Sequence, residues 1–138
     1  MDMIRSVIAV LAGMGLVSIL VEVLEFTLVN AVAGGTVTDM TSYFAVRNRP
    51  VMLGAQLGYT SVAAILGGYL TARVAGNREV LHGGVAAALK TVALVWGFTL
   101  GEFAGSTPAW MRIALLLATG PAMLAGASVR ARAARSDA

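Results

Sequence analysis

Three ionisable residues lie inside otherwise apolar stretches of this sequence, where their chemistry needs an explanation. Glu22 and Glu25 lie in an apolar run over residues 7–32, and Lys90 lies in a second run over residues 82–101. A charge at the middle of a bilayer costs at least about 2.5–3.5 kcal/mol on insertion scales. Such residues usually face the interior of a helix bundle and pair with one another.

The spacing of these residues suggests a shared site. Glu22 and Glu25 are neighbours on one helix face because they are three residues apart. Lys90 can reach Glu22 if the two helices run in the same direction, and the second carboxyl group is then left free to carry a proton. The first interpretation is a structural ion pair that fixes helix register, with Glu25 hydrated near the outer interface. The alternative is a proton- or cation-coupled site built from these three residues.

Other kinds of chemistry are excluded or poorly supported by the residue counts. The chain has no Cys and one His, so thiol catalysis, disulfides and a metal site with several His ligands are excluded. No Ser or Thr has a His or Asp arrangement that would activate it as a nucleophile. We therefore expect no enzyme, no metal and no cofactor. A lone His82 could ligate a haem or a chlorophyll, but a polar residue at a helix end is the expected role.

The elements that position these residues are four membrane-spanning helices. Of the 138 residues, 58% are hydrophobic and 12% are charged, and the mean hydropathy is +0.81. An ordinary soluble domain has about 25% charged residues. Apolar runs and turn signals predict an all-α bundle in one membrane domain, with helices over about 7–32, 51–72, 82–101 and 110–128. Residues 129–138 are expected to form a short, frayed basic tail.

The distribution of arginine predicts the orientation of these helices. One side of the predicted bundle carries six arginines, namely Arg5, Arg73, Arg78, Arg130, Arg132 and Arg135. The other side carries three, namely Arg47, Arg49 and Arg112. Cytoplasmic loops are enriched in Lys and Arg, so both termini are expected in the cytoplasm. The net charge of +3 then favours lipid headgroups as the acidic partner, and no nucleic acid is expected.

Small residues recur at helical spacing and predict close helix packing. They are Gly54, Gly58 and Gly68 in the second run, Gly83, Gly97 and Gly101 in the third, and Ala118, Ala122 and Gly126 in the fourth. Such residues let helix backbones approach closely. Packing within one chain is the first interpretation, and an interface between copies is the second. Pro121 is expected to kink the last helix because it removes a helical hydrogen-bond donor.

Several segments resemble a known group of proteins. The motif Gly67-Gly68-Tyr69-Leu70-Thr71-Ala72-Arg73-Val74-Ala75 is followed by Asn77-Arg78 and Leu81-His82-Gly83, and later by Thr107-Pro108-Ala109-Trp110 and Pro121-Ala122. Together they resemble a family of small uncharacterised bacterial four-helix integral membrane proteins. The resemblance covers residues 58–126 and does not include Glu22 and Glu25. It implies a four-helix topology in a bacterial inner membrane and no known activity.

These observations predict a non-enzymatic membrane protein that acts by helix association. It would be a homo-oligomer or an accessory subunit of a membrane complex. The alternative is a minimal oligomeric proton- or cation-coupled transporter or channel that uses Glu22, Glu25 and Lys90. A third interpretation is a pigment- or haem-bearing subunit that uses His82.

Overall fold

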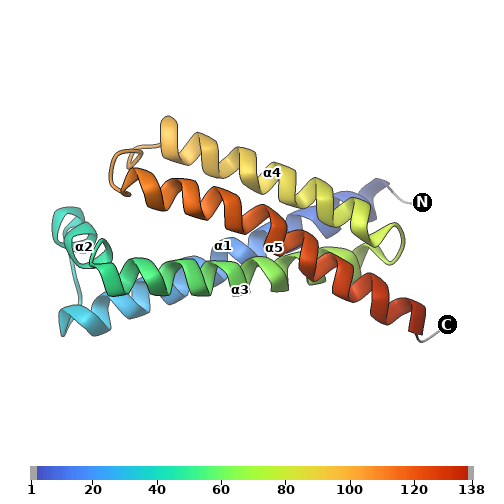
Figure 1. The fold of residues 1–138 in the computed structure, drawn as a ribbon, viewed down its shortest axis with the longest axis horizontal. Coiled ribbons are helices and arrows are strands. Elements are labelled where there is room, and N and C mark those ends of the chain that lie inside the picture. The colour runs from blue at the N-terminus through green and yellow to red at the C-terminus, as the bar shows by residue number, and fades with distance from the viewer. Residues whose placement is uncertain (1–2, 137–138) are drawn as a thin grey trace.

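The computed structural model describes residues 3–136, and these residues form five helices joined by short connections (Figure 1). The helices are α1 (Met3–Ala33), α2 (Met40–Arg47), α3 (Pro50–Ala75), α4 (Glu79–Thr99) and α5 (Ala109–Ser136). All but α2 are long and apolar enough to cross a membrane. The prediction of an all-α bundle with four such helices is therefore confirmed.

The turn residues explain where α3 begins and ends. Pro50 occupies the first turn of α3, where its missing N–H group is not needed for a helical hydrogen bond. Gly76 follows the last residue of α3 with φ of 71°, and its N–H donates to the Ala72 carbonyl. This left-handed conformation suits glycine because it has no side chain to clash. Arg78 adopts φ of 43° directly before α4 begins.

Two parts of the chain differ from the sequence prediction. The segment over residues 129–136 belongs to α5, so the expected frayed tail is helical there, and residues 137–138 lie outside the described part. The connection between the first two predicted spans contains the extra helix α2. Its N-cap is Asp39, whose carboxylate accepts a hydrogen bond of 2.8 Å from the Ser42 N–H. An acidic N-cap of this kind satisfies a backbone donor that the helix leaves free.

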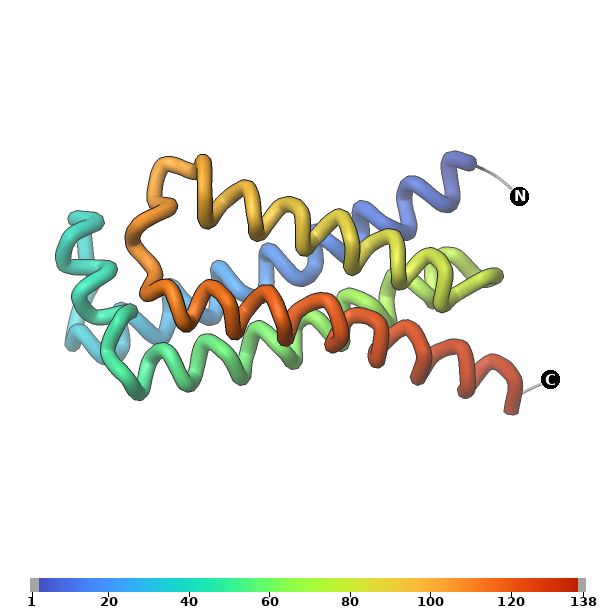
Figure 2. The backbone as a smooth tube through the Cα atoms, turned by 45° about the horizontal axis from the view of Figure 1, so that its top comes forward, coloured from blue at the N-terminus to red at the C-terminus, as the bar shows by residue number. Residues whose placement is uncertain are grey.

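The centre of the bundle is α3, which packs against both α1 and α5. α4 packs mainly on α5. Both described termini lie at one end of the bundle, called here the terminal end, and α2 lies at the opposite end, called the α2 end (Figure 1). Figure 2 shows that α1 and α4 cross near the terminal end and separate toward the α2 end.

Close contacts between helices are concentrated in the half of the bundle nearer the terminal end. A Cβ atom added to Gly68 would collide with the Met123 carbonyl of α5, and one added to Gly126 would collide with the Ile65 carbonyl of α3. Gly83 lies directly against Ala127. These contacts hold α3, α4 and α5 together where the core is built from small side chains.

The other small residues of the predicted stripes lie elsewhere. Gly54, Gly58 and Gly97 have open space where a side chain would be, and Gly101 faces only the end of its own helix. They therefore do not join helices within the chain. Ala118 and Ala122 are half-buried, and α5 continues through the exposed Pro121 without ending there.

One close contact was not predicted and involves α1. A side chain at Gly13 would collide with Thr71 and with the Gly67 carbonyl. This contact brings α1 and α3 together near the terminal end.

Candidate functional site

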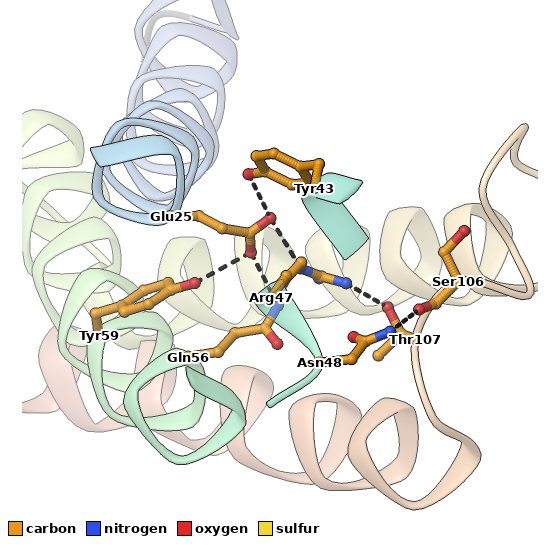
Figure 3. A network of polar contacts seen from close by, with 8 residues as sticks. All are labelled: Glu25, Tyr43, Arg47, Asn48, Gln56, Tyr59, Ser106 and Thr107. Carbon is orange, nitrogen blue, oxygen red and sulfur yellow. Dashed lines mark hydrogen bonds and ion pairs between the residues drawn. The ribbon is translucent and has the colours of Figure 1, made fainter. Parts of the chain in front are cut away.

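A network of polar side chains surrounds Glu25 at the α2 end (Figure 3). One carboxylate oxygen of Glu25 accepts a hydrogen bond of 3.1 Å from the Tyr43 hydroxyl and lies 2.9 Å from Nε of Arg47. The other oxygen accepts bonds of 3.1 Å from Gln56 Nε2 and 3.0 Å from the Tyr59 hydroxyl. Both oxygens are thus occupied, and the carboxylate has little room to bind a further ligand.

Arg47 is the cationic partner of Glu25 and is itself nearly buried. The Arg47 and Glu25 side chains are 10% and 14% exposed. The guanidinium also donates a hydrogen bond of 2.8 Å to the Thr107 hydroxyl, and it lies 5.5 Å from the centre of the Phe44 ring. A charge this buried is tolerated when it is paired and hydrogen-bonded, as it is here.

The network joins parts of the chain that are distant in sequence. Glu25 comes from α1, Arg47 from α2, and Gln56 from α3, while Thr107 lies in the connection between α4 and α5. The neighbouring Asn48 adds a hydrogen bond of 2.7 Å from its side-chain amide to the Ser106 carbonyl in the same connection. The network therefore fixes α2 and this connection onto the bundle.

Tyr43 acts as a neutral donor in this network. Burial, together with the adjacent Glu25 carboxylate, raises the pKa of the Tyr43 hydroxyl well above its usual value of 10.0. The hydroxyl therefore stays protonated at physiological pH and donates a hydrogen bond to the Glu25 carboxylate.

Two buried polar atoms of α3 lie near this network without a protein partner. These atoms are Oε1 of Gln56 and Oγ1 of Thr60, and neither has a hydrogen bond among the described residues. The two side chains lie one helical turn apart, and each is less than a tenth exposed. An unsatisfied buried polar group of this kind costs about 1–3 kcal/mol.

Glu22 and Lys90 do not form the ion pair that the sequence suggested. The Lys90 ammonium donates a hydrogen bond of 2.7 Å to the Ser18 hydroxyl, one turn away from Glu22. Over residues 3–136, the one ion pair joins Glu25 to Arg47. Glu22 is exposed and has no hydrogen-bond partner in the described chain. The expected group of three thus divides into a bound Glu25, an exposed Glu22 and a half-buried Lys90 that bonds to Ser18.

An open cleft lies between α1 and the last turns of α4, where these helices separate. We call this space of about 450 Å³ the α4 cleft, and it is lined by residues that include Glu22, Arg47, Leu94, Gly97 and Glu102. A second space of about 680 Å³ lies between α1 and α2, and Glu22 lines it as well. Glu22 is therefore accessible from two sides.

These charges lie within helices that are long and apolar enough to cross a membrane. Glu25 lies about 30 Å along α1 from Arg5, which is about the thickness of a hydrocarbon core. Glu22 lies about one helical turn closer to the terminal end than Glu25. Lys90 lies about 16 Å from the beginning of α4 and thus near the middle of this helix.

His82 is held by neighbouring groups near the terminal end. It is buried, and its two ring nitrogens lie 3.1 Å from the Arg78 carbonyl oxygen and 3.0 Å from the Ser6 hydroxyl. A haem or chlorophyll ligand would have to replace one of these partners. Within residues 3–136, no group of three or more His, Asp or Glu side chains lies close enough to hold a metal ion.

The residues that bind Glu25 are not among those that the sequence pattern predicts for a site. The pattern places Arg47 beside a predicted span and predicts no helix over α2. The Asp39 N-cap followed by apolar residues is the local signal for α2. A lone amide inside an apolar run, such as Gln56, often marks a buried hydrogen bond and is the signal for this residue.

Comparison of the chain with family models, with curated proteins and with solved structures finds no match. The function must therefore be argued from the geometry of this region.

Proposed function

We propose that this chain acts by associating with another membrane helix, which fills the α4 cleft. The observation that carries this proposal is the exposure of Glu22 at membrane depth beside the half-buried Lys90. Lipid cannot hydrogen-bond or neutralise these groups, and each lone charge would cost several kcal/mol there. A neighbouring helix that covers the cleft removes this cost.

The remainder of the bundle supports this role because it is already well fixed. The close glycine contacts hold the half near the terminal end, and the Glu25 network holds α2 and the α4–α5 connection. The cleft thus has firm walls on most sides. A preformed surface of this kind binds a partner with less loss of conformational freedom.

The resemblance to the bacterial four-helix family and the distribution of arginine support a membrane and an orientation for this proposal. The protein would lie in a bacterial inner membrane with the terminal end toward the cytoplasm, because most of the flanking arginines are at that end. The α2 end and the mouth of the cleft would then face the outside. No chemical reaction is part of this role.

The test is the composition of the protein purified in a mild detergent. We expect a complex, made of several copies or of this chain with other membrane chains, that dissociates when Gly97→Trp fills the cleft. The matched control is Gly15→Trp, because Gly15 also has open space around it but lies on α1 away from the cleft. A monomer under all mild conditions would refute the proposal.

A second candidate is proton- or cation-coupled transport, and one observation favours it. Glu22 is a free carboxylate in a cleft that is open toward the α2 end, whereas contacts such as Gly13 with Gly67 close the terminal end. This shape is suited to binding a cation from one side. Proton flux into liposomes that is lost in Glu22→Gln and kept in Glu79→Gln would support transport, and an absence of flux under any gradient would exclude it.

A further inference from the structure

We propose that the helix filling the α4 cleft is α3 of a second copy of this chain, with Arg49 of that copy beside Glu102. This inference rests on the proposed function and names the partner. The charges of the cleft, the free face of α3 and the shared end of the bundle at which Arg49 and Glu102 lie support it.

The α4 cleft carries an excess of negative charge. Glu22 and Glu102 both line it, and neither has a hydrogen bond or an ion pair with the described residues. Glu25 and Arg47 also line the cleft but neutralise each other. Lys90 points to Ser18 and compensates at most one of the two free carboxylates. A partner with an exposed cation at the cleft mouth is therefore favoured.

The outer half of α3 supplies such a cation. Arg49 immediately precedes α3, is exposed, and makes no side-chain hydrogen bond or ion pair within residues 3–136. The face of α3 below it carries Val51, Gly54, Gly58 and Val62, and both valines are more than half exposed. Gly54 and Gly58 have open space around them. The two glycines make the helix surface flat at the middle of this face. Because Gly97 in the wall of the α4 cleft also lacks a side chain, the two helix backbones can approach closely there.

The two charges lie at the same end of the bundle. α3 runs away from the α2 end and α4 runs toward it (Figure 1). Arg49 directly precedes α3, and Glu102 lies in the turns that follow α4. Two copies with the same orientation therefore present Arg49 of one and Glu102 of the other at the same end.

The two surfaces lie on different sides of the bundle, so the contact is heterologous. In Figure 1, α4 forms the upper edge of the molecule near the α2 end, and α3 lies in the lower part beside α1. Each copy then offers its α3 face to one neighbour and its cleft to another. Such contacts close into a ring or continue as a chain of copies.

The absence of Cys makes disulfide cross-linking in membranes a direct test. Copies with Gly54→Cys and differently tagged copies with Gly97→Cys are co-expressed and oxidised. We expect a cross-linked heterodimer that contains both tags. The matched control pairs Gly97→Cys with Ile113→Cys, because Ile113 is exposed on α5 at a similar depth but outside the proposed interface. A yield no higher than that of this control would overturn the inference.

A charge reversal provides an independent readout. We expect Arg49→Glu or Glu102→Arg alone to reduce the cross-linking yield about tenfold, and the two together to restore it. Thermal unfolding of each variant checks that the bundle still folds. Failure of the double variant to restore cross-linking would also contradict the proposed pairing.

The same experiment separates this inference from the proposed function. If Gly97→Cys cross-links to a different membrane chain and not to Gly54→Cys, the cleft is an association site but the partner is not a second copy. If it cross-links to neither, both proposals fail.

Discussion

Removal of the Glu25 charge tests whether its network holds the α2 end together. The separation of 2.9 Å between Arg47 Nε and the carboxylate corresponds to about 6 kcal/mol of attraction at an effective dielectric constant of about 20. Desolvation of both ions offsets much of this attraction. However, Glu25→Gln leaves Arg47 nearly buried without an anionic partner, although Thr107 still accepts its hydrogen bond. We expect a loss of about 3–5 kcal/mol in the free energy of unfolding.

A double-mutant cycle isolates the interaction between these two residues. Arg47→Met is expected to cost a similar amount, because it leaves the buried carboxylate without a cation. The double variant should be less destabilised than the sum of the single variants, with a coupling of about 2–3 kcal/mol. Equilibrium unfolding in detergent, followed by the fluorescence of the two tryptophans, gives the required free energies.

Glu22→Gln is the matched control for this experiment, because Glu22 lies one turn away on the same helix and has no hydrogen-bond or ion-pair partner among residues 3–136. In the isolated chain it should not lower the free energy of unfolding, because it removes an unpaired charge from an apolar helix. The reasoning is refuted if the costs of the Glu25 and Arg47 variants simply add, or if Glu22→Gln costs as much as Glu25→Gln.

Three further predictions concern other parts of the chain. Thr60→Val should raise the free energy of unfolding by about 1 kcal/mol, because it removes an unsatisfied buried hydroxyl. Thr119→Val is the control and should give no such gain, because the Thr119 hydroxyl donates a hydrogen bond to its own helix. Equilibrium unfolding in detergent compares the two variants. Gly68→Val should cost about 3 kcal/mol or prevent folding, and Gly58→Val should leave the single chain folded, as circular dichroism on heating would show. The pKa of Asp39 lies below its usual value of 3.8, mainly because the carboxylate accepts a backbone hydrogen bond from Ser42. The capping of α2 by the Asp39 carboxylate is therefore fully present above pH 3.8, and it is lost as the pH falls through the lowered pKa of the folded state. The protection of α2 amides from exchange, relative to their intrinsic exchange rates, should therefore fall below about pH 4, and Asp39→Asn, which keeps an N-cap oxygen, should remove this loss.

The fold could be predicted from the sequence more fully than the site. Membrane helices follow from local composition, and turn residues such as Pro50 and Gly76 fix their ends. The partner of Glu25 depends instead on how α2 returns across the bundle, which is a tertiary contact with no local signal. The sequence predicts that Lys90 reaches Glu22, but Lys90 bonds to Ser18. The reason is that α4 and α1 are separated by the α4 cleft at the level of Glu22.

The small-residue stripes show the same limit. Gly68 and Gly97 have the same local sequence character, yet Gly68 is pressed against another helix and Gly97 faces open space. Four-residue spacing indicates that a helix can be approached closely. It does not indicate whether the approaching helix belongs to the same chain.

The network at the α2 end also affects the order in which the bundle can be completed during synthesis. Glu25 and Arg47 leave the ribosome early, and they can meet as soon as α1 and α2 are in place. Ser106 and Thr107, which hold Asn48 and Arg47, emerge only after α4. A chain that ends with α4 would lack both residues, so Arg47 and Asn48 would each have one hydrogen bond fewer. The bonding of the α2 end is therefore completed only once the connection between α4 and α5 has been made.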